Sequence, residues 1–149
     1  MDYLKKILLV FVVVVVCVGI IFTISSFQGQ NNSKQLQNQN DQINLQWNTD
    51  LNSALKLSQK SNKLVFIDFY ADWCGYCKEL NKETFTDQKV KEKFAQKYVL
   101  VKINGDLYPD ITSKYKVYGY PTLLILDSNG NEIKRQTGFV SATELLNII

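Results

Sequence analysis

The sequence contains no histidine, and this absence removes several kinds of chemistry from consideration. Without an imidazole there is no histidine general acid or base, no cysteine–histidine pair and no metal site that uses histidine. Cysteine is scarce as well: three cysteines are too few for a disulfide framework, and a four-ligand zinc site would need a second Cys-x-x-Cys motif. We therefore expect no metal ion and no bound cofactor, and we assign any covalent chemistry to the thiols.

The chain also lacks a large excess of charge of either sign. Its 17 basic and 14 acidic residues are interspersed and give a formal net charge of +3. Nucleic-acid binding needs a clustered basic surface, so we expect no nucleic-acid partner. The length of 149 residues leaves room for one domain of ordinary size in addition to an N-terminal segment.

Charge is absent altogether from a long apolar run near the N-terminus, between Ile7 and Ile24. A run of this length crosses a hydrocarbon core of about 30 Å as a helix, so we predict a membrane anchor at residues 7–27. A cleaved signal peptide is the alternative, but the residues at 25–27 form a poor cleavage site. Cys17 lies inside the run, and we interpret it as a buried, inert thiol.

Basic residues flank this run unequally, and the asymmetry predicts its orientation. Lys5 and Lys6 lie directly before it, whereas the next basic residue, Lys34, lies well beyond its end. The positive-inside rule therefore places residues 1–6 in the cytoplasm. The rest of the chain is then extracytoplasmic, in the periplasm or at the outer surface of a single-pass membrane protein.

The strongest chemical signal is the motif Trp73-Cys74-Gly75-Tyr76-Cys77. It stands where an apolar run, Leu64 to Ala71, gives way to a charged, helix-forming stretch. Two thiols at this spacing can close a small disulfide ring and reopen it. The partial positive charge of a first helical turn favours a thiolate, so we expect a lowered pKa for Cys74. The motif predicts a thiol-disulfide redox site, and a static disulfide or two inactive thiols is the alternative.

Residues 28–46 are rich in Asn and Gln and predict a flexible linker, which leads to a folded domain at residues 47–149. Helical and strand periods alternate in this domain, which predicts an α/β fold with a mixed sheet between helices. The first predicted elements are a helix from Leu51 that is capped by Thr49 or Asp50 and stops before Ser61, a strand at 64–70, and a helix opened by the Cys-x-x-Cys motif. A helix that begins at Thr86 or Asp87 and contains Val90 and Phe94 follows, then a strand at 98–103 and a short helix capped by Asp110 that runs through Tyr115. The last elements are strands at 122–126 and 132–137, joined by a turn at 128–131, and a helix with a capping box of Ser141 and Glu144.

These motifs together resemble the thioredoxin family. The resemblance rests on the segment 73–78 after an Asp-containing strand, on Tyr120-Pro121-Thr122 before another strand, and on Gly138 before the last helix. It covers residues 47–149. Within that range the segments 71–74, 77–80 and 84–87 are similar to the C-terminal thioredoxin-like domain of the DsbD-type membrane disulfide-interchange reductases. The resemblance implies a thioredoxin fold behind one N-terminal transmembrane helix.

The resemblance also implies roles for the residues that carry the chemistry. Cys74 becomes the attacking thiol and Cys77 the resolving thiol, which together form a redox-active disulfide. Asp68 matches a buried proton acceptor of the family, and Lys102 matches a lysine near it. From the sequence alone, Asp68 is either a carboxylate whose pKa is raised by burial in a central strand or a solvated residue of an edge strand.

Five further residues are implied to bind the partner protein. Pro121 matches a cis-proline that faces the cysteines in the family, although the sequence alone favours a trans bond. Tyr120, which precedes it, is larger than the residues usual at that position. Trp73, Gly75 and Tyr76 surround the thiols, and the two aromatic residues either line a partner groove or cover the core.

These observations predict a membrane-anchored, extracytoplasmic thiol-disulfide oxidoreductase that reduces or exchanges disulfides of partner proteins. We expect a monomer that receives electrons from a membrane-embedded thiol carrier. Apocytochrome c, misoxidised proteins and sulfenic acids are candidate recipients. With no histidine between the two cysteines, a reducing couple is favoured over an oxidising one. A dithiol oxidase of the same fold and a non-catalytic binding module or chaperone are the alternatives.

Overall fold

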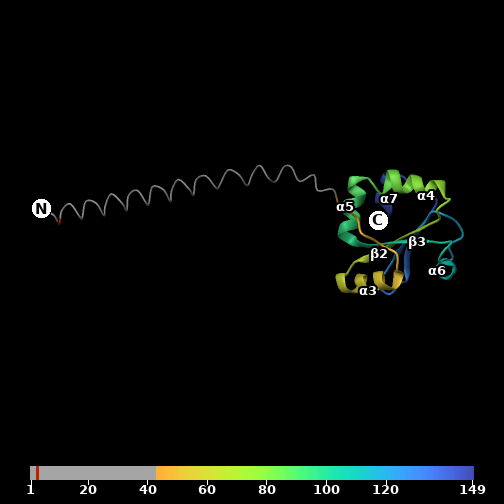
Figure 1. Ribbon diagram of the computed structural model, residues 1–149, viewed down its shortest axis with the longest axis horizontal. Helices are drawn as coiled ribbons and strands as arrows, with labels where there is room; N and C mark the ends of the chain where they lie inside the picture. The colour runs from red at the N-terminus through yellow and green to blue at the C-terminus, as the bar shows by residue number, and fades with distance from the viewer. Residues whose placement is uncertain (1–2, 4–42) are drawn as a thin grey trace. The chain divides into compact units, whose positions relative to one another are not determined.

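The computed structural model describes Tyr3 and residues 43–149, of which 43–149 form one compact unit (Figure 1). The predicted cytoplasmic segment, the predicted anchor, Cys17 and most of the predicted linker lie outside the described residues. Within the part of the chain that is described, no helix combines the length and the apolar character needed to cross a membrane. The domain limits at the N-terminal side therefore stay predictions.

A mixed sheet of five strands forms the centre of the compact unit, in the order β1-β3-β2-β4-β5. Strand β2 runs parallel to β3 and antiparallel to β4. Its position in the middle explains its nearly continuous apolar sequence, because both of its faces are covered. The strands are β1 (Trp47–Asn48), β2 (Leu64–Tyr70), β3 (Tyr98–Asn104), β4 (Thr122–Leu126) and β5 (Glu132–Thr137).

Helices cover both faces of this sheet and bury two separate cores (Figure 1). Leu51 and Ala54 of α3 pack into the first core, and Phe94 of α5 and Leu145 of α7 pack into the second. The helical elements are α3 (Leu51–Ser61), α4 (Gly75–Glu79), the π-helical turn η1 (Leu80–Thr84), α5 (Gln88–Lys97), α6 (Pro109–Lys114) and α7 (Ala142–Ile148). This arrangement confirms the predicted α/β fold with a mixed sheet.

Most of the predicted helix boundaries are confirmed by hydrogen bonds. The Asp50 carboxylate accepts from the backbone N–H of Ser53 at 2.9 Å, and the Asp87 carboxylate caps α5 in the same manner. The capping box of Ser141 and Glu144 is present at the start of α7. These caps form because the first turn of a helix leaves backbone N–H groups without partners, which a short polar side chain satisfies.

One predicted cap is wrong, because Asp110 does not begin α6. Tyr108 occupies the N-cap position without a side-chain hydrogen bond, and Pro109 is the first helical residue. Proline has no N–H to be capped and its φ is already helical, so it begins the helix by itself. Asp110 lies inside the first turn. Helix α3 also includes Ser61, its last residue, and the C-cap residue Asn62 has a left-handed backbone with φ of 53°.

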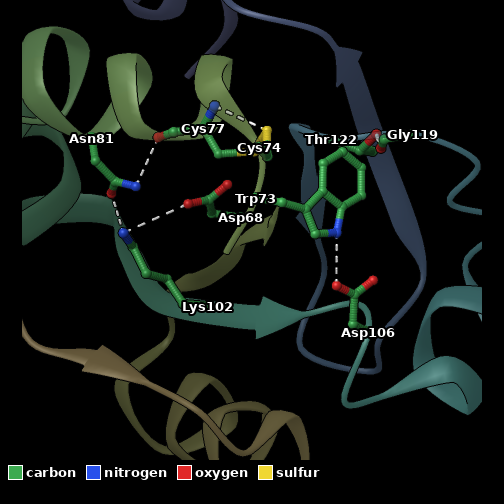
Figure 2. The surroundings of a disulfide bond; sticks show 9 residues. All are labelled: Asp68, Trp73, Cys74, Cys77, Asn81, Lys102, Asp106, Gly119 and Thr122. Carbon is green, nitrogen blue, oxygen red and sulfur yellow. Dashed lines mark hydrogen bonds and ion pairs between the residues drawn. A yellow bond between two sulfur atoms is a disulfide. The ribbon is translucent and has the colours of Figure 1, made fainter. Parts of the chain in front are cut away.

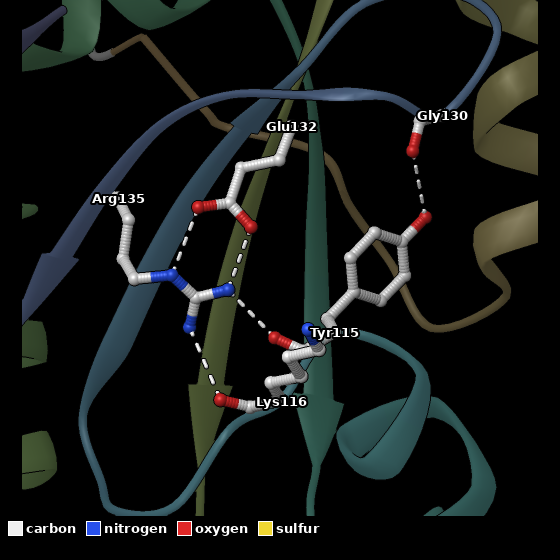
Figure 3. A network of polar contacts seen from close by, with 5 residues as sticks. All are labelled: Tyr115, Lys116, Gly130, Glu132 and Arg135. Carbon is white, nitrogen blue, oxygen red and sulfur yellow. Dashed lines mark hydrogen bonds and ion pairs between the residues drawn. The ribbon is translucent and has the colours of Figure 1, made fainter.

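An ion-paired network fixes the chain segment between α6 and β4 (Figure 3). The Arg135 guanidinium pairs with Glu132 at 2.6 Å and donates to the carbonyl of Tyr115 at 2.6 Å. It also donates to the carbonyl of Lys116, and the Tyr115 hydroxyl donates to the carbonyl of Gly130. Strand β5 thereby holds the connection that leads to Tyr120 and Pro121.

Candidate active site

The two thiols of the Cys-x-x-Cys motif are joined in a disulfide at the start of α4 (Figure 2). Cys74 is the N-cap residue, and the backbone N–H of Cys77 donates to its sulfur at 3.1 Å. The Cα atoms lie 5.3 Å apart. Both cysteines are buried, with exposures of 4% for Cys74 and 2% for Cys77, so the disulfide meets solvent over a small area.

The aromatic neighbours of the thiols are exposed and therefore do not cover the core. Trp73 is 71% exposed and Tyr76 is 65% exposed. The indole N–H of Trp73 donates to the Asp106 carboxylate at 2.9 Å, and its ring lies 6.0 Å from the ring of Tyr120. Gly75 is exposed as well, with open space beside its Cα. The residues next to the two cysteines in the chain are therefore accessible from solvent.

Tyr120 lies beside the redox pair, and Pro121 follows it on the loop before β4. The bond between them is cis, as the resemblance implies. Tyr120 packs against the small cluster that Ala71, Cys74 and Cys77 form. Its hydroxyl occupies a notch at Gly105, where a Cβ atom would lie 1.8 Å from the hydroxyl oxygen. The loops after β3 and before β4 therefore meet at this contact.

Asp68 lies inside the protein on the central strand, which rules out the alternative of a solvated edge-strand residue. Its side chain is fully buried, and neither carboxylate oxygen has a hydrogen-bond partner among the described residues. Because side chains alternate along a strand, Asp68 shares its face with Phe66 and Tyr70. Phe66 packs in the core that contains Leu80, and Tyr70 packs against the cysteine cluster. The carboxylate thus points to the side of the sheet where the disulfide lies (Figure 2).

Lys102 is the cross-strand neighbour of Asp68, as the parallel register of β2 and β3 places the two residues opposite each other. Its Nζ lies 3.7 Å from Asp68 Oδ2, within ion-pair distance and beyond hydrogen-bond distance. Burial raises the pKa of Asp68 to about 6, while the charge of Lys102 acts in the opposite direction. Burial also lowers the pKa of Lys102.

Sequence reasoning missed two polar residues of this site. Asn81 lies on η1 and donates from Nδ2 to the carbonyl of Cys77 at 2.8 Å, and its Oδ1 accepts from Lys102 Nζ. The spacing of four residues from Cys77 could have predicted this contact, because an Asn side chain can bond to the backbone carbonyl one helical turn before it. Asp106 is the second missed residue. It follows β3, which ends beside the end of the parallel strand β2, and β2 leads to Trp73.

The arrangement supplies the parts that disulfide exchange requires. A disulfide lies at a helix start, a buried carboxylate of raised pKa points toward it, and exposed aromatic residues are next to it in the chain. A carboxylate whose pKa is about 6 is ionised at neutral pH and can accept a proton from a thiol. In its oxidised state the pair is ready to receive two electrons.

Comparison with protein families and curated proteins identifies relatives of the folded part. A family model described as a thioredoxin-like domain matches residues 51–149. The thiol:disulfide interchange protein DsbD of Yersinia pestis is 43% identical over 95 residues, which cover 60% of this chain and 16% of that protein. The DsbD of Actinobacillus pleuropneumoniae is 41% identical over 97 residues, 62% of this chain and 17% of that protein. The chain therefore spans less than a fifth of the length of these relatives.

Solved structures show the same fold. A thioredoxin from Thermus thermophilus superposes with a TM-score of 0.63 at 25% identity, covering 69% of this chain and 82% of that one. The germline-specific thioredoxin Deadhead of Drosophila melanogaster gives a TM-score of 0.56 at 31% identity over 69% of this chain and 94% of that one. The chain belongs to the thioredoxin-like family, and its Cys74–Cys77 disulfide supports thiol-disulfide oxidoreductase activity.

Proposed function

We propose that the chain is a membrane-anchored, extracytoplasmic reductase that reduces or exchanges disulfides of partner proteins. The observation that carries the proposal is the Cys74–Cys77 disulfide with a buried Asp68 carboxylate directed toward it, whose oxygens have no hydrogen-bond partner among the described residues. The similarity to a region of thiol:disulfide interchange proteins supports the same chemistry. The apolar run at residues 7–27, with lysines before it, supports the anchor and its orientation.

The reduced protein reacts with a partner disulfide in two steps. The Cys74 thiolate attacks one partner sulfur, a mixed disulfide forms, and the other partner sulfur leaves as a thiolate that takes a proton. Asp68 then accepts the proton of Cys77, and the Cys77 thiolate attacks the Cys74 sulfur. The Cys74–Cys77 disulfide forms, and the second partner sulfur leaves as a thiolate that takes a proton as Asp68 gives up the one it accepted. The partner is then a dithiol, so two electrons have passed from this protein to its partner.

We assign roles to the remaining site residues. Lys102 lies 3.7 Å from Asp68 and stabilises the carboxylate when it is ionised. Trp73, Gly75, Tyr76, Tyr120 and Pro121 contact the extended chain of the partner around the disulfide. After each turnover the disulfide must be reduced again, and we assign this step to a membrane-embedded dithiol donor that is itself oxidised to a disulfide.

The reduction potential of the full chain tests the direction of electron flow. The protein is equilibrated in dithiothreitol or glutathione buffers, and the free thiols of Cys74 and Cys77 are counted by alkylation. We expect a value near that of thioredoxin, about −270 mV. A value near about −120 mV would make the protein a dithiol oxidase, and the lack of a reversible two-electron couple would favour a binding module.

Variants of the two cysteines test the order of attack. Replacing Cys77 by Ser should trap a mixed disulfide between Cys74 and a partner, because the second step is then blocked. The matched Cys74→Ser variant should trap none. Equal trapping by both variants would contradict the assignment of Cys74 as the attacking thiol.

The location is tested by labelling intact cells with a membrane-impermeant thiol reagent after mild reduction. Labelling of Cys74 in the membrane fraction, at the full-length mass of 17.1 kDa, is expected for an uncleaved anchor with an outside domain. Labelling that requires cell lysis would place the domain on the cytoplasmic side. A shorter protein in the soluble fraction would show that the segment is a cleaved signal peptide.

A further inference from the structure

The Asn81 side chain connects two parts of the active site that lie on different elements, Cys77 on α4 and Lys102 on β3. Its Nδ2 donates to the backbone carbonyl of Cys77 at 2.8 Å, and its Oδ1 accepts from the ammonium of Lys102 (Figure 2). Lys102 in turn is the ion-pair partner of Asp68. The half-buried Asn81 amide thus bridges Cys77, which must lose a proton, and Lys102. Lys102 lies next to Asp68, the residue proposed to accept that proton.

The Lys102 ammonium is held at a distance from the carboxylate that attracts it. It lies 3.7 Å from Asp68 Oδ2, whereas a charge-assisted hydrogen bond would bring the two atoms to about 2.8 Å. Three aromatic rings surround the ammonium, with centroids 4.8 Å away for Trp47, 5.6 Å for Phe85 and 5.9 Å for Tyr70. Cation–π attraction to these rings and the hydrogen bond to Asn81 oppose its movement onto the carboxylate.

We infer that Asn81 is a positioning residue that keeps Asp68 a strong enough base by holding Lys102 off its carboxylate. The inference rests on the proposed function, in which Asp68 accepts the proton of Cys77. An ammonium bonded directly to a carboxylate stabilises the ionised form and weakens it as a base. The bond from Asn81 to the Cys77 carbonyl keeps the amide in place at the end of α4, so the lysine position is tied to the redox helix.

Asn81 can act on Asp68 through Lys102 because few other charges face this carboxylate. Strand β3 contributes Lys102, and β4 contributes the apolar Leu123 at the paired position. Helix α4 contributes Cys77, and its N-cap residue is Cys74. Within the described residues, Lys102 is the cation within 4.0 Å of Asp68, so a change at Asn81 reaches the carboxylate through that ammonium.

Titration of the Asp68 carboxyl carbon by NMR in the oxidised full chain, kept in detergent, tests the inference. Asn81→Leu should lower the pKa of Asp68 by about one unit, because the released ammonium moves onto the carboxylate. Lys102→Met should raise the pKa of Asp68. In the Lys102→Met background, Asn81→Leu should have no effect. The control is Lys82→Ala, which removes a charge from the neighbouring exposed position and should leave the Asp68 pKa unchanged.

Asn81→Asp provides a second variant in case Asn81→Leu does not fold. It keeps an oxygen for Lys102 and adds a negative charge, so the pKa of Asp68 should rise, opposite in sign to the effect of leucine. An unchanged Asp68 pKa in both Asn81 variants would overturn the inference. So would a shift by Asn81→Leu that persists when Lys102 is methionine, since the effect would then not pass through the lysine.

The rate at which the mixed disulfide resolves separates this inference from the proposed function. With Asp68 about one unit weaker as a base, Asn81→Leu should slow resolution about threefold above pH 7 and move the acid limb of the pH profile to lower pH. If Asp68→Asn leaves the resolution rate unchanged, the proposed role of Asp68 fails. The NMR shift in Asn81→Leu would in that case still establish that Asn81 positions Lys102.

Discussion

At the scale of single residues, the unusual feature is a carboxylate in the middle of the protein without a hydrogen-bond partner. Both oxygens of Asp68 are buried without a hydrogen-bond partner among the described residues, and the Lys102 ammonium forms an ion pair with Oδ2 at 3.7 Å. An ionised group in such a place costs folding free energy unless it is paired and hydrogen-bonded. The cost is consistent with a residue retained for proton transfer rather than for stability.

Asp68→Asn should stabilise the oxidised protein at neutral and alkaline pH. The folded pKa of Asp68 is about 6 and the unfolded value is 3.8, so the folded state binds more protons between these values and stability falls as pH rises through that window. Removing the charge should raise the free energy of unfolding at pH 8 by about 2 kcal/mol, after allowing for an unsatisfied amide.

Urea denaturation from pH 4 to pH 8 measures this effect. The difference between the variant and the wild type should be small at pH 4 and should grow toward pH 7. Asp110→Asn is a suitable control, because its carboxylate is exposed in the first turn of α6. A difference that is independent of pH would show that Asp68 is not the titrating group.

At the scale of elements, the site depends on a contact between two loops. The loop after β3 carries Gly105 and the loop before β4 carries Tyr120, whose hydroxyl fills the notch at the glycine. The backbone N–H of Gly105 also donates to the carbonyl of Tyr70 at 2.8 Å, which fixes the first loop to the end of β2. A side chain at position 105 therefore cannot be accommodated only by a shift of the Gly105 backbone away from Tyr120.

Gly105→Ala should displace the Tyr120 ring and destabilise the protein by about 2 kcal/mol, as overpacking of a tight contact typically does. The added Cβ would lie 1.8 Å from the hydroxyl oxygen and 2.3 Å from the ring carbon that bears it. In a Tyr120→Val background the same change should cost little, because the ring is gone. Denaturation midpoints of the four proteins measure the coupling, and equal costs in both backgrounds would contradict the contact.

At the scale of the whole molecule, the folded unit is larger than the part that the family model matches. The match begins at Leu51, whereas the compact unit begins at Ile43. Strand β1 pairs with β3, and the Trp47 ring lies 5.2 Å from Phe85 and 6.0 Å from Phe94. Leu45 also packs against the second core. These contacts cover the edge of β3 beside the lysine of the active site.

A chain of residues 43–149 should keep the stability of the folded unit, and a chain of residues 51–149 should lose about 3–5 kcal/mol. The loss is the value expected when a large aromatic residue is removed from a core. Chemical denaturation of the two pieces, both oxidised, provides the measurement. Equal stability would show that β1 and Trp47 contribute little to the fold.

Local patterns were sufficient to predict most elements and the redox pair. Each of these signals acts within a few residues of the chain, so the sequence alone contains it. They are the apolar run of β2, the caps at Asp50 and Asp87, the capping box of Ser141 and the Cys-x-x-Cys spacing. The resemblance to thioredoxins added the cis bond at Pro121 and the buried position of Asp68. Asp110 failed as a cap because Pro109 begins the helix by itself.

Contacts between segments far apart in the chain were decided only by the tertiary structure. Strand β1 has two residues, too few for a period, and it forms because β3 offers an edge. The exposure of Trp73 and Tyr76, the bond from Trp73 to Asp106 and the fit of Tyr120 at Gly105 all depend on how loops meet. Asn81 acquires its position between Cys77 and Lys102 only when η1 packs over β3. Side-chain chemistry and local spacing determined the reaction, and packing between distant segments decided the electrostatic setting in which the thiols react.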